Sequence, residues 1–250
     1  MDIHGRVALV TGAAHRVGKV IALALAERGA HIVVHFNRSE EAAHETEAEI
    51  RALGVQAIMV RANLGNPLEI EDMFTQVEAF FGRLEILVNS ASTFQSADLL
   101  ELTLDAWNYV MAINLRAPFQ CGQLAAHLML ARGTGGVIVN VADVAGQRPW
   151  LKYPHHSVSK AGLLMLTQVM AKSLGPDIRV NAVVPGPVLK PERMPDARWY
   201  HLGQMLPLKR TGRAENVGQA VVALVENDFI TGAILNVDGG DSLLGSLDVL

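Results

Sequence analysis

The strongest constraint on the fold of this chain is a regular alternation of short apolar segments with longer segments of helical periodicity. Seven short segments rich in β-branched residues are predicted as strands, namely Val7–Val10, Ile32–Phe36, Ala57–Val60, Ile86–Val88, Val137–Val141, Ile178–Val184 and Ile234–Val237. The helices predicted among them are Val17–Arg28, Glu40–Leu53, Leu68–Phe81, Leu104–Leu130, His155–Leu174 and Glu215–Glu226. Because the strands are almost continuously apolar, the pattern indicates a parallel sheet buried between helices on both faces.

The domain organisation follows from length and regularity. A chain of 250 residues suits one large α/β domain or two small ones, and we favour a single domain over residues 1–250. The alternation contains no repeat, low-complexity tract or linker. The least regular segment is Pro185–Pro207, whose prolines and adjacent Trp199 and Tyr200 are typical of a loop or a short helical lid.

Composition narrows the class of partner. The net charge of −4 comes from scattered acids and bases without a Lys/Arg block, so we expect no nucleic acid partner. We expect neither an export signal nor a membrane partner, because no basic stretch precedes a long apolar run. Cys121 is the single cysteine, which suits a reducing compartment. These features favour a cytoplasmic protein that acts on a small-molecule substrate.

A glycine-containing segment, Thr11–Gly18, joins the first strand to the first helix. Gly12 permits a tight turn, Gly18 allows close approach of helix and strand, and the helix N-terminus with Val17 would face a phosphate. This position in a doubly wound pattern predicts a dinucleotide site. Arg16 takes the place of the usual middle glycine, where it could contact the pyrophosphate, reach the substrate pocket or simply be a solvated residue at the helix start.

The end of the second strand predicts which nicotinamide cofactor is bound. An NAD enzyme would place an acidic residue there for the ribose 2′-hydroxyl, but this chain has Phe36 followed by Asn37, Arg38 and Ser39. The guanidinium and hydroxyl suit a 2′-phosphate, so we predict NADPH. Alternatively, Arg38 is a surface cation and Ser39 an N-cap of the next helix, and these roles can coexist with phosphate binding.

The motifs together resemble the short-chain dehydrogenase/reductase family over nearly the whole chain. The matching features are Thr11–Gly18, Asn89-Ser90-Ala91, Asn114, Lys160, Pro185-Gly186 and Val237-Asp238-Gly239-Gly240. Within that family, the chain is most similar to pteridine reductases through Arg16, His35 with Arg38 and Ser39, Ser92-Thr93-Phe94, and Asp143. The resemblance implies a single-domain Rossmann fold with a seven-stranded doubly wound parallel sheet.

The resemblance also implies ligand contacts. It assigns further cofactor contacts to His35, Asn63, Leu64, Asn89, Ala91, Lys160, Pro185, Gly186 and Val188. Asn63 stands where an aspartate is usual, although an amide can still contact an adenine edge. Ser92, Phe94 and Tyr153 would border the substrate, with Phe94 stacking a flat heterocycle against the nicotinamide. The alternative for Phe94 is a partly buried loop aromatic.

The catalytic candidates are Asp143, His156, Lys160 and Asn114. His156 and Lys160 share a helix face, at the spacing that the family uses for Tyr and Lys. Asp143 follows the fifth strand and should face the same crevice. By the resemblance, the lysine lowers the pKa of the tyrosine and holds the nicotinamide ribose, and Asn114 helps relay protons through water. The expected tyrosine is therefore a histidine in this chain.

This replacement leaves the proton donor open. Lys160 should lower the pKa of His156, whereas a nearby Asp143 should raise it. If Asp143 prevails, His156 is a general acid; otherwise water or Asp143 supplies the proton. Tyr153 is a substitute donor or a pocket wall. We expect no metal site, because adjacent His155 and His156 would point apart on a helix.

Three functions are considered. The leading hypothesis is an NADPH-dependent reductase of a pterin-like or other planar carbonyl or imine substrate. The second is a catalytically silent NADP(H)-binding protein, suggested by His156. The third is a 3-oxoacyl or sugar reductase of the same family, disfavoured by Asp143 and Phe94. The apolar helices Leu104–Leu130 and His155–Leu174 also predict a homodimer or homotetramer.

Overall fold

The sheet contains the seven predicted strands, each with bounds within one residue of the prediction. The structure is a computed structural model that describes residues 1–131 and 133–244. Its strands are β1(Val7–Val10), β2(His31–Phe36), β3(Ala57–Arg61), β4(Ile86–Asn89), β5(Gly136–Val141), β6(Ile178–Pro185) and β7(Ile234–Val237). They form one parallel sheet in the order β3-β2-β1-β4-β5-β6-β7. This is the predicted doubly wound topology.

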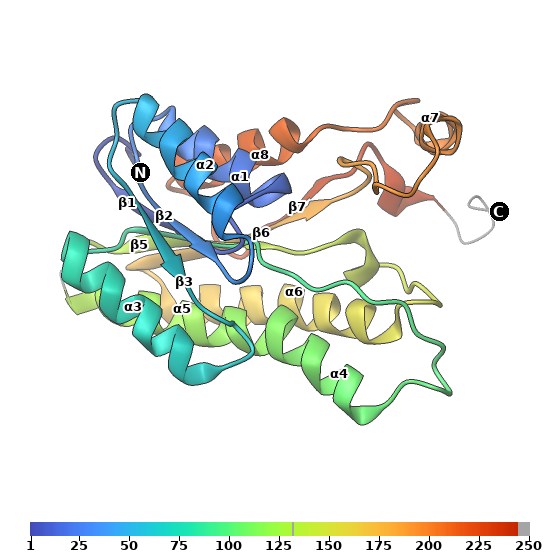
Figure 1. Cartoon of the computed structure of the whole chain (residues 1–250), viewed down its shortest axis with the longest axis horizontal. Coiled ribbons are helices and arrows are strands. Elements are labelled where there is room, and N and C mark those ends of the chain that lie inside the picture. Colours follow the sequence, from blue (N-terminus) through green and yellow to red (C-terminus); the bar gives the residue numbers. More distant parts are fainter. Residues whose placement is uncertain (132, 245–250) are drawn as a thin grey trace.

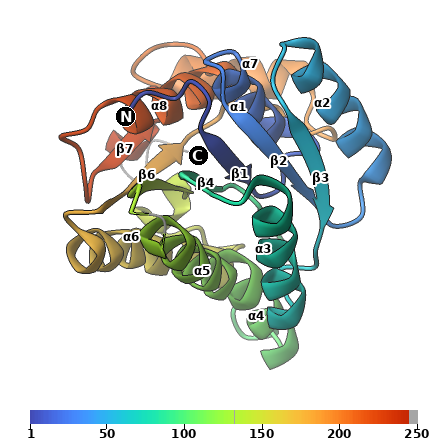
Figure 2. The same ribbon diagram turned by 90° about the vertical axis from the view of Figure 1, so that its left-hand side faces the viewer.

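Helices cover both faces of this sheet (Figures 1 and 2). One layer contains α1(Arg16–Ala26), α2(Glu40–Ala52) and α8(Ala214–Glu226). The other contains α3(Pro67–Phe81), α4(Leu104–Met111), α5(Ala117–Ala131) and α6(Pro154–Leu174). Within β1, Ala8 and Val10 pack in the cluster with α1 and α8, whereas Val7 and Leu9 pack in the cluster with α3 and α5. All four side chains are fully buried, which explains the unbroken apolar sequence of the strand.

The order of the strands reverses at β1, which pairs with β2 on one side and with β4 on the other. Ligands of open α/β sheets bind outside the carboxyl ends of the strands at such a reversal. The segment expected to be a loop or lid includes the short helix α7(Asp196–Met205). Two single-turn 3₁₀ helices, η2(Val144–Gly146) and η3(Asp241–Leu243), lie near the same end of the sheet.

The long helix predicted over Leu104–Leu130 is interrupted. Between α4 and α5 lies a π-helical segment, η1(Ala112–Arg116), in which the N–H of Ala117 donates to the carbonyl of Ala112. Pro118 gives the physical reason, because a proline in a regular helix clashes with the carbonyl four residues earlier, here that of Asn114. The wider turn therefore falls where an α-helical turn is least favourable.

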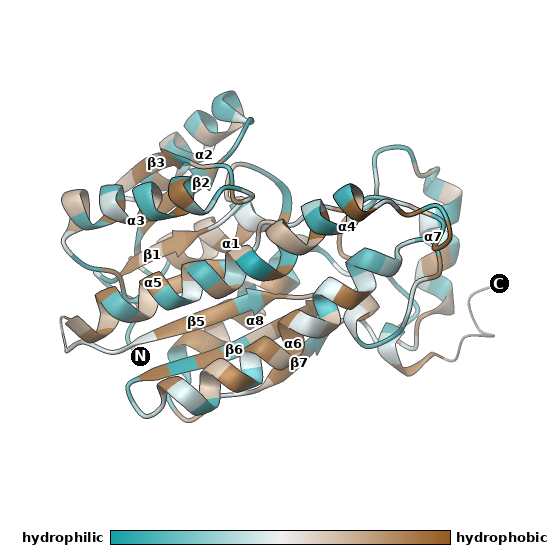
Figure 3. Cartoon of the chain, turned by 90° about the horizontal axis from the view of Figure 1, so that it is seen from below, coloured by the Kyte–Doolittle hydropathy of each residue, from teal (hydrophilic) through white to brown (hydrophobic). Residues whose placement is uncertain are grey.

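Hydropathy follows this layered arrangement. In Figure 3 the strands β1 and β5 are mostly hydrophobic, whereas the helices that cover them alternate between hydrophilic and hydrophobic residues. This is the pattern of helices with one buried side. Within the described residues, none of the helices combines the length and the apolar character that crossing a membrane requires.

Candidate functional site

A large cleft of about 1120 Å³ opens at the carboxyl ends of the strands. It is lined by most of the residues that the sequence singled out: Gly12, Arg16, Val17, Gly18, His35, Arg38, Ser39, Asn63, Leu64, Ala91, Ser92, Phe94, Asp143, Tyr153, His156, Lys160, Pro185, Gly186 and Val188. Its volume is slightly above the usual range for a pocket that holds one drug-sized ligand. The fold thus gathers the predicted nucleotide and catalytic residues in one cavity, and their ligand contacts stay predictions.

The glycine turn requires its glycines. Gly12 has φ +68°, and a Cβ there would lie 3.0 Å from the Cα of Ala91. A Cβ on Gly18 would lie 2.2 Å from the carbonyl oxygen of Gly12, which no relaxation of a flexible side chain could relieve. Arg16, at the place of the middle glycine, also has a left-handed backbone with φ 56°. That conformation is unfavourable for a non-glycine residue by about 1–2 kcal/mol.

The side chain of His35 holds this turn in place through a hydrogen bond. Its Nδ1 accepts a hydrogen bond from the N–H of Gly12 at 3.0 Å, and its Nε2 lies 3.0 Å from the carbonyl oxygen of Ala62. This pairing requires the proton on Nε2. Burial lowers the pKa of His35 to about 4, so the ring is neutral at physiological pH. The resemblance suggested cofactor contact for His35, and the geometry adds a role in holding the phosphate turn.

The loops after β2 and β3 form the far end of the cleft. Arg38 and Ser39 line it immediately before α2. Ser39 occupies the N-cap position, yet its hydroxyl makes no capping hydrogen bond to the described helix. The Oδ1 atom of Asn63 accepts from the N–H of Gly65 at 3.0 Å, which holds this amide against its own loop. Because Ser39 makes no capping hydrogen bond, its hydroxyl is not engaged in the N-cap role that could compete with ligand binding.

His156 lies at the centre of the half of the cleft that holds the catalytic candidates, which we call the catalytic half. It is in the first turn of α6, which starts at Pro154, and it is 2% exposed. Its Nε2 lies 3.7 Å from Oδ2 of Asp143 and has no hydrogen-bond partner among the described residues. The other carboxylate oxygen of Asp143 accepts from the N–H of Ala145 at 2.8 Å, which anchors the aspartate at the start of η2. Asp143 and His156 are therefore close, but not within hydrogen-bond distance.

Lys160 lies one turn further along α6 and is also buried. Its Nζ donates to the carbonyl oxygen of Val141 at 2.9 Å. Burial lowers the pKa of Lys160 to about 8, with Asp143 acting in the opposite direction. The lysine is thus mainly charged at pH 7, within a site whose low polarity penalises that charge.

Two predicted site residues do not line the cleft. The amide of Asn89 donates to Oδ1 of Asn140 at 2.9 Å and ties β4 to β5, and its contact with the cofactor stays a prediction. Asn114, in η1, lies behind His156, with its Nδ2 3.3 Å from the Nδ1 of the histidine. Its Oδ1 accepts from the N–H of Thr93 at 2.8 Å. In this geometry Asn114 can orient His156 and the Thr93 loop, and a part in a water relay stays a prediction.

An aromatic wall closes the substrate end, and sequence reasoning found only part of it. The rings of Phe94 and Tyr153 stack with centroids 4.2 Å apart, and Trp150 meets Phe94 edge-on at 6.0 Å. The edge of His156 approaches Phe94 at 4.8 Å. Trp150 was missed, although an aromatic close to Tyr153 in the same loop was a usable signal. One face of the Phe94 ring is therefore covered by Tyr153.

In residues 1–131 and 133–244, no three His, Cys, Asp or Glu side chains are arranged to hold a metal ion. The neighbouring His155 is fully buried, and neither of its ring nitrogens has a hydrogen-bond partner within that part of the chain.

Comparisons with known proteins identify the relatives of this chain. Residues 12–242 match a family described as enoyl-(acyl carrier protein) reductase. A 3-oxoacyl-[acyl-carrier-protein] reductase of Synechocystis is 36% identical over 94% of this chain and 96% of its own length. A short-chain type dehydrogenase/reductase of Picea abies is 32% identical over 94% of this chain and 92% of its own length.

Solved structures agree with the sequence relatives. A short-chain type dehydrogenase/reductase from Mycobacterium marinum superimposes with a TM-score of 0.87 at 30% identity, covering 96% of each chain. An acetoin dehydrogenase from Salmonella typhimurium gives a TM-score of 0.89 at 28% identity, covering 96% of this chain and 98% of that one. The chain therefore belongs to the short-chain dehydrogenase/reductase family and is an oxidoreductase of that type.

Proposed function

We propose that this protein is an NADPH-dependent reductase of a pterin-like or other planar carbonyl or imine substrate. The observation that carries the proposal is the shared cavity, in which Arg38 and Ser39 lie at one end and an aromatic wall beside His156 lies at the other. A planar substrate suits a wall of Phe94, Tyr153 and Trp150, because aromatic faces stack on flat rings.

The residues present fit the cofactor. The turn at Gly12 brings backbone N–H groups to the start of α1 without a Cβ in the way, and the helix terminus favours a pyrophosphate. Arg38 would pair with the 2′-phosphate through its planar donor fork. When bound, NADPH supplies the hydride. The side chain of Lys160 would hold the nicotinamide ribose from the floor of the cleft.

The protein residues must then deliver one proton to the substrate oxygen or nitrogen. His156 and Asp143 form a pair 3.7 Å apart at the aromatic wall. In a reduction, His156 donates the proton from Nε2, and the adjacent carboxylate stabilises the ring while it is charged. On the opposite edge of the ring, the carbonyl oxygen of Thr93 lies 3.3 Å from Nδ1 and can accept from it while the ring is charged. Orientation of the imidazole therefore comes from both sides.

A second candidate, reduction of a 3-oxoacyl thioester, is favoured by the relatives. The Synechocystis protein named as a 3-oxoacyl-[acyl-carrier-protein] reductase is 36% identical to this chain, and a Staphylococcus aureus protein of the same name is 33% identical. The aromatic wall is a less suitable surface for a flexible acyl chain than for a flat heterocycle. The two candidates differ in the substrate and share the NADPH site.

Turnover with a defined panel tests the proposal. NADPH oxidation is followed with dihydrobiopterin, with a 3-oxoacyl thioester and without substrate. We expect the pterin to be reduced faster than the thioester, and a Phe94→Leu variant to lose more of its pterin rate than of its thioester rate. Faster reduction of the thioester would support the second candidate. NADPH binding without turnover of any compound would support the catalytically silent alternative.

We also propose that the chain forms a homodimer or homotetramer through α4, α5 and α6. Leu104, Phe119, Met165 and Val169 on these helices are exposed large apolar residues, and pairing with a second copy would bury them. Light scattering at micromolar concentration should give a dimer or tetramer. Met165→Glu should dissociate it, whereas Leu53→Glu should not, because the exposed Leu53 follows the end of α2 on the other layer of helices. A wild-type monomer would contradict this proposal.

A further inference from the structure

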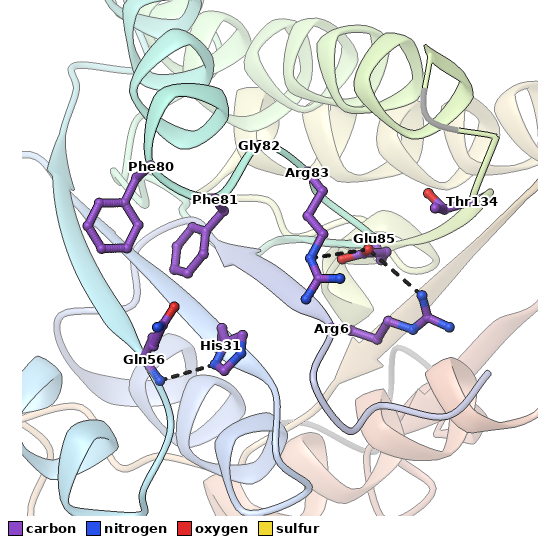
Figure 4. Close-up of a pocket in the computed structure, with 9 residues that line it drawn as sticks. All are labelled: Arg6, His31, Gln56, Phe80, Phe81, Gly82, Arg83, Glu85 and Thr134. Atoms are coloured by element: carbon purple, nitrogen blue, oxygen red, sulfur yellow. Dashed lines mark hydrogen bonds and ion pairs between the residues drawn. The ribbon is translucent and has the colours of Figure 1, made fainter.

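A second cavity, of about 590 Å³, lies at the opposite end of the sheet from the cleft (Figure 4). It lies at the end of the sheet where the strands begin and the preceding helices end. The side chains that carry the argument are Arg6, His31, Phe80, Phe81, Arg83 and Glu85. None of them lines the nucleotide cleft. A ligand of this cavity would therefore bind separately from the substrate and cofactor of the proposed reaction.

The charged centre of this cavity is Glu85, which is fully buried. Its Oε2 accepts from the N–H of Val7 at 2.8 Å. Its Oε1 lies 3.8 Å from Arg6 Nη1 and 3.7 Å from Arg83 Nε, and it has no hydrogen-bond partner among the described residues. Both distances are within the range of ion pairs but are too long for hydrogen bonds. The Oε1 atom of Glu85 therefore accepts no hydrogen bond from either guanidinium.

The charges of the cavity do not balance. Two guanidinium groups, Arg6 and Arg83, face one carboxylate, that of Glu85. Burial, followed by the field of Arg83, lowers the pKa of His31, so its ring is neutral at pH 7. One positive charge is left over. A single negative charge, such as that of a carboxylate, would neutralise it, and guanidinium forks bind carboxylates in a bidentate geometry.

Beside the arginines lies an aromatic surface. The rings of His31 and Phe81 are stacked with centroids 6.1 Å apart and an interplanar angle of 9°. Phe80 meets Phe81 edge-on at 4.7 Å and is 57% exposed, which is unusual for a phenylalanine. Figure 4 shows these two phenyl rings on one side of Arg83 and the Arg6–Glu85 pair on the other. Apolar and cationic surfaces are thus adjacent.

We propose that this cavity binds a small aromatic carboxylate, with the carboxylate between Arg6 and Arg83 and the ring against Phe80 and Phe81. The cavity volume suits a ligand of this size. The free Nε2–H of His31 is a further donor, because its Nδ1 already accepts from the N–H of Gln56 at 3.1 Å. The surplus positive charge lies on the partly exposed side chains of Arg6 and Arg83 and stands beside the exposed ring of Phe80, so the cavity offers contacts for both parts of the ligand.

Benzoate is the probe, and its binding to the full chain is measured by titration calorimetry and by ligand-observed NMR. Benzyl alcohol keeps the ring without the charge, and acetate keeps the charge without the ring. We expect benzoate to bind at least tenfold more tightly than either. Equal binding of benzoate and acetate, or no binding of benzoate to the folded protein, would overturn the proposal.

Variants locate the site. Arg83→Gln should weaken benzoate binding at least tenfold, whereas Glu85→Gln, which removes the competing carboxylate, should strengthen it several-fold. Arg28→Gln is the matched control, because this arginine pairs with Glu226 outside the cavity. Phe80→Ala replaces an exposed ring and should weaken benzoate several-fold without affecting acetate. Thermal unfolding confirms that each variant is folded.

The cleft at the other end also has an aromatic wall, so the binding site must be distinguished from it. Benzoate affinity should be unchanged in Phe94→Ala and in the presence of excess NADPH. Affinity lost in Phe94→Ala and retained in Phe80→Ala would place benzoate in the cleft and overturn the proposal. If Arg83→Gln does not fold, the opposite signs expected for Glu85→Gln and Phe80→Ala decide the outcome.

Discussion

The two halves of the cleft are built in different ways. In the nucleotide half, backbone geometry dominates, because Gly12 and Gly18 admit no Cβ and His35 bonds directly to the turn. In the catalytic half, side chains from separate elements meet across gaps such as the 3.7 Å between His156 and Asp143. A backbone-defined site tolerates few replacements, whereas a side-chain-defined site can change its chemistry while the fold stays the same.

The largest expected effect is in the nucleotide half. Gly18→Ala would place a Cβ 2.2 Å from the carbonyl oxygen of Gly12, so helix α1 must move away from the turn. We expect no measurable NADPH binding. Lys19→Ala, at the next position of the helix, is the control and should bind normally. Fluorescence titration measures both. Normal binding by Gly18→Ala would mean that the turn is less constrained than its geometry indicates.

The next effect tests the catalytic half. With an active substrate, His156→Ala should lower kcat by about a hundredfold or more, the usual contribution of a general acid, and leave NADPH affinity nearly unchanged. If the protein is a slow pterin reductase, His156→Tyr should raise its rate. If His156 is adapted to another substrate, both variants should lose activity. An unchanged rate in His156→Ala would instead leave Asp143 or water as the donor.

The choice of cofactor gives a smaller, quantitative effect. Arg38→Ala removes a charge-assisted phosphate contact of roughly 1.5–3 kcal/mol, so NADPH affinity should fall about ten- to a hundredfold. NADH lacks the 2′-phosphate, and its affinity should hardly change. Titration of both cofactors with wild type and variant makes the comparison. Equal losses, or a wild type that prefers NADH, would remove Arg38 from cofactor selection.

The smallest effect concerns stability. The pKa of Lys160 is lowered from 10.5 to about 8 in the folded chain, so between these values the unfolded chain binds more protons and stability increases with pH. Below pH 8 the buried charge is fully unfavourable. Lys160→Met should therefore stabilise the protein at pH 7, by about 2 kcal/mol after loss of the hydrogen bond to Val141.

Urea unfolding at pH 7 and pH 10 measures this change. The gain in stability should shrink as the pH rises from about 8 to 10.5, because the wild-type lysine becomes neutral. A gain that is the same at both pH values would show that burial of the charge is not its cause. A gain that shrinks at high pH would contrast Lys160, which is buried with its charge, with His35, which is buried as a neutral ring.

The sequence predicted the fold and the position of the glycine turn because both depend on local patterns. Continuous apolar runs located every strand, and the order of Gly12, Arg16 and Gly18 located the turn. The orientation of Asn89 toward Asn140 could not be predicted, because it depends on the pairing of β4 with β5. The distance between His156 and Asp143 likewise depends on how α6 packs against η2.

Other features could not be predicted from sequence motifs. Trp150 joins the aromatic wall through a loop without regular periodicity. The cavity around Glu85 is assembled from residues at the starts of several strands, which no spacing in the sequence connects. Pro118 is different, since a proline inside a predicted helix was a readable sign of the interruption at η1.

The wide turn at η1 also fixes the length of the chain at this point. A π turn contains one residue more than an α turn, and one residue corresponds to a rotation of about 100° around the helix axis. Deleting a residue within Ala112–Arg116 would regularise the backbone but rotate α4 relative to α5, and Asn114 could not stay beside His156. Engineered insertions and deletions should therefore be kept out of this segment, because even a single-residue change in length would rotate α4 relative to α5.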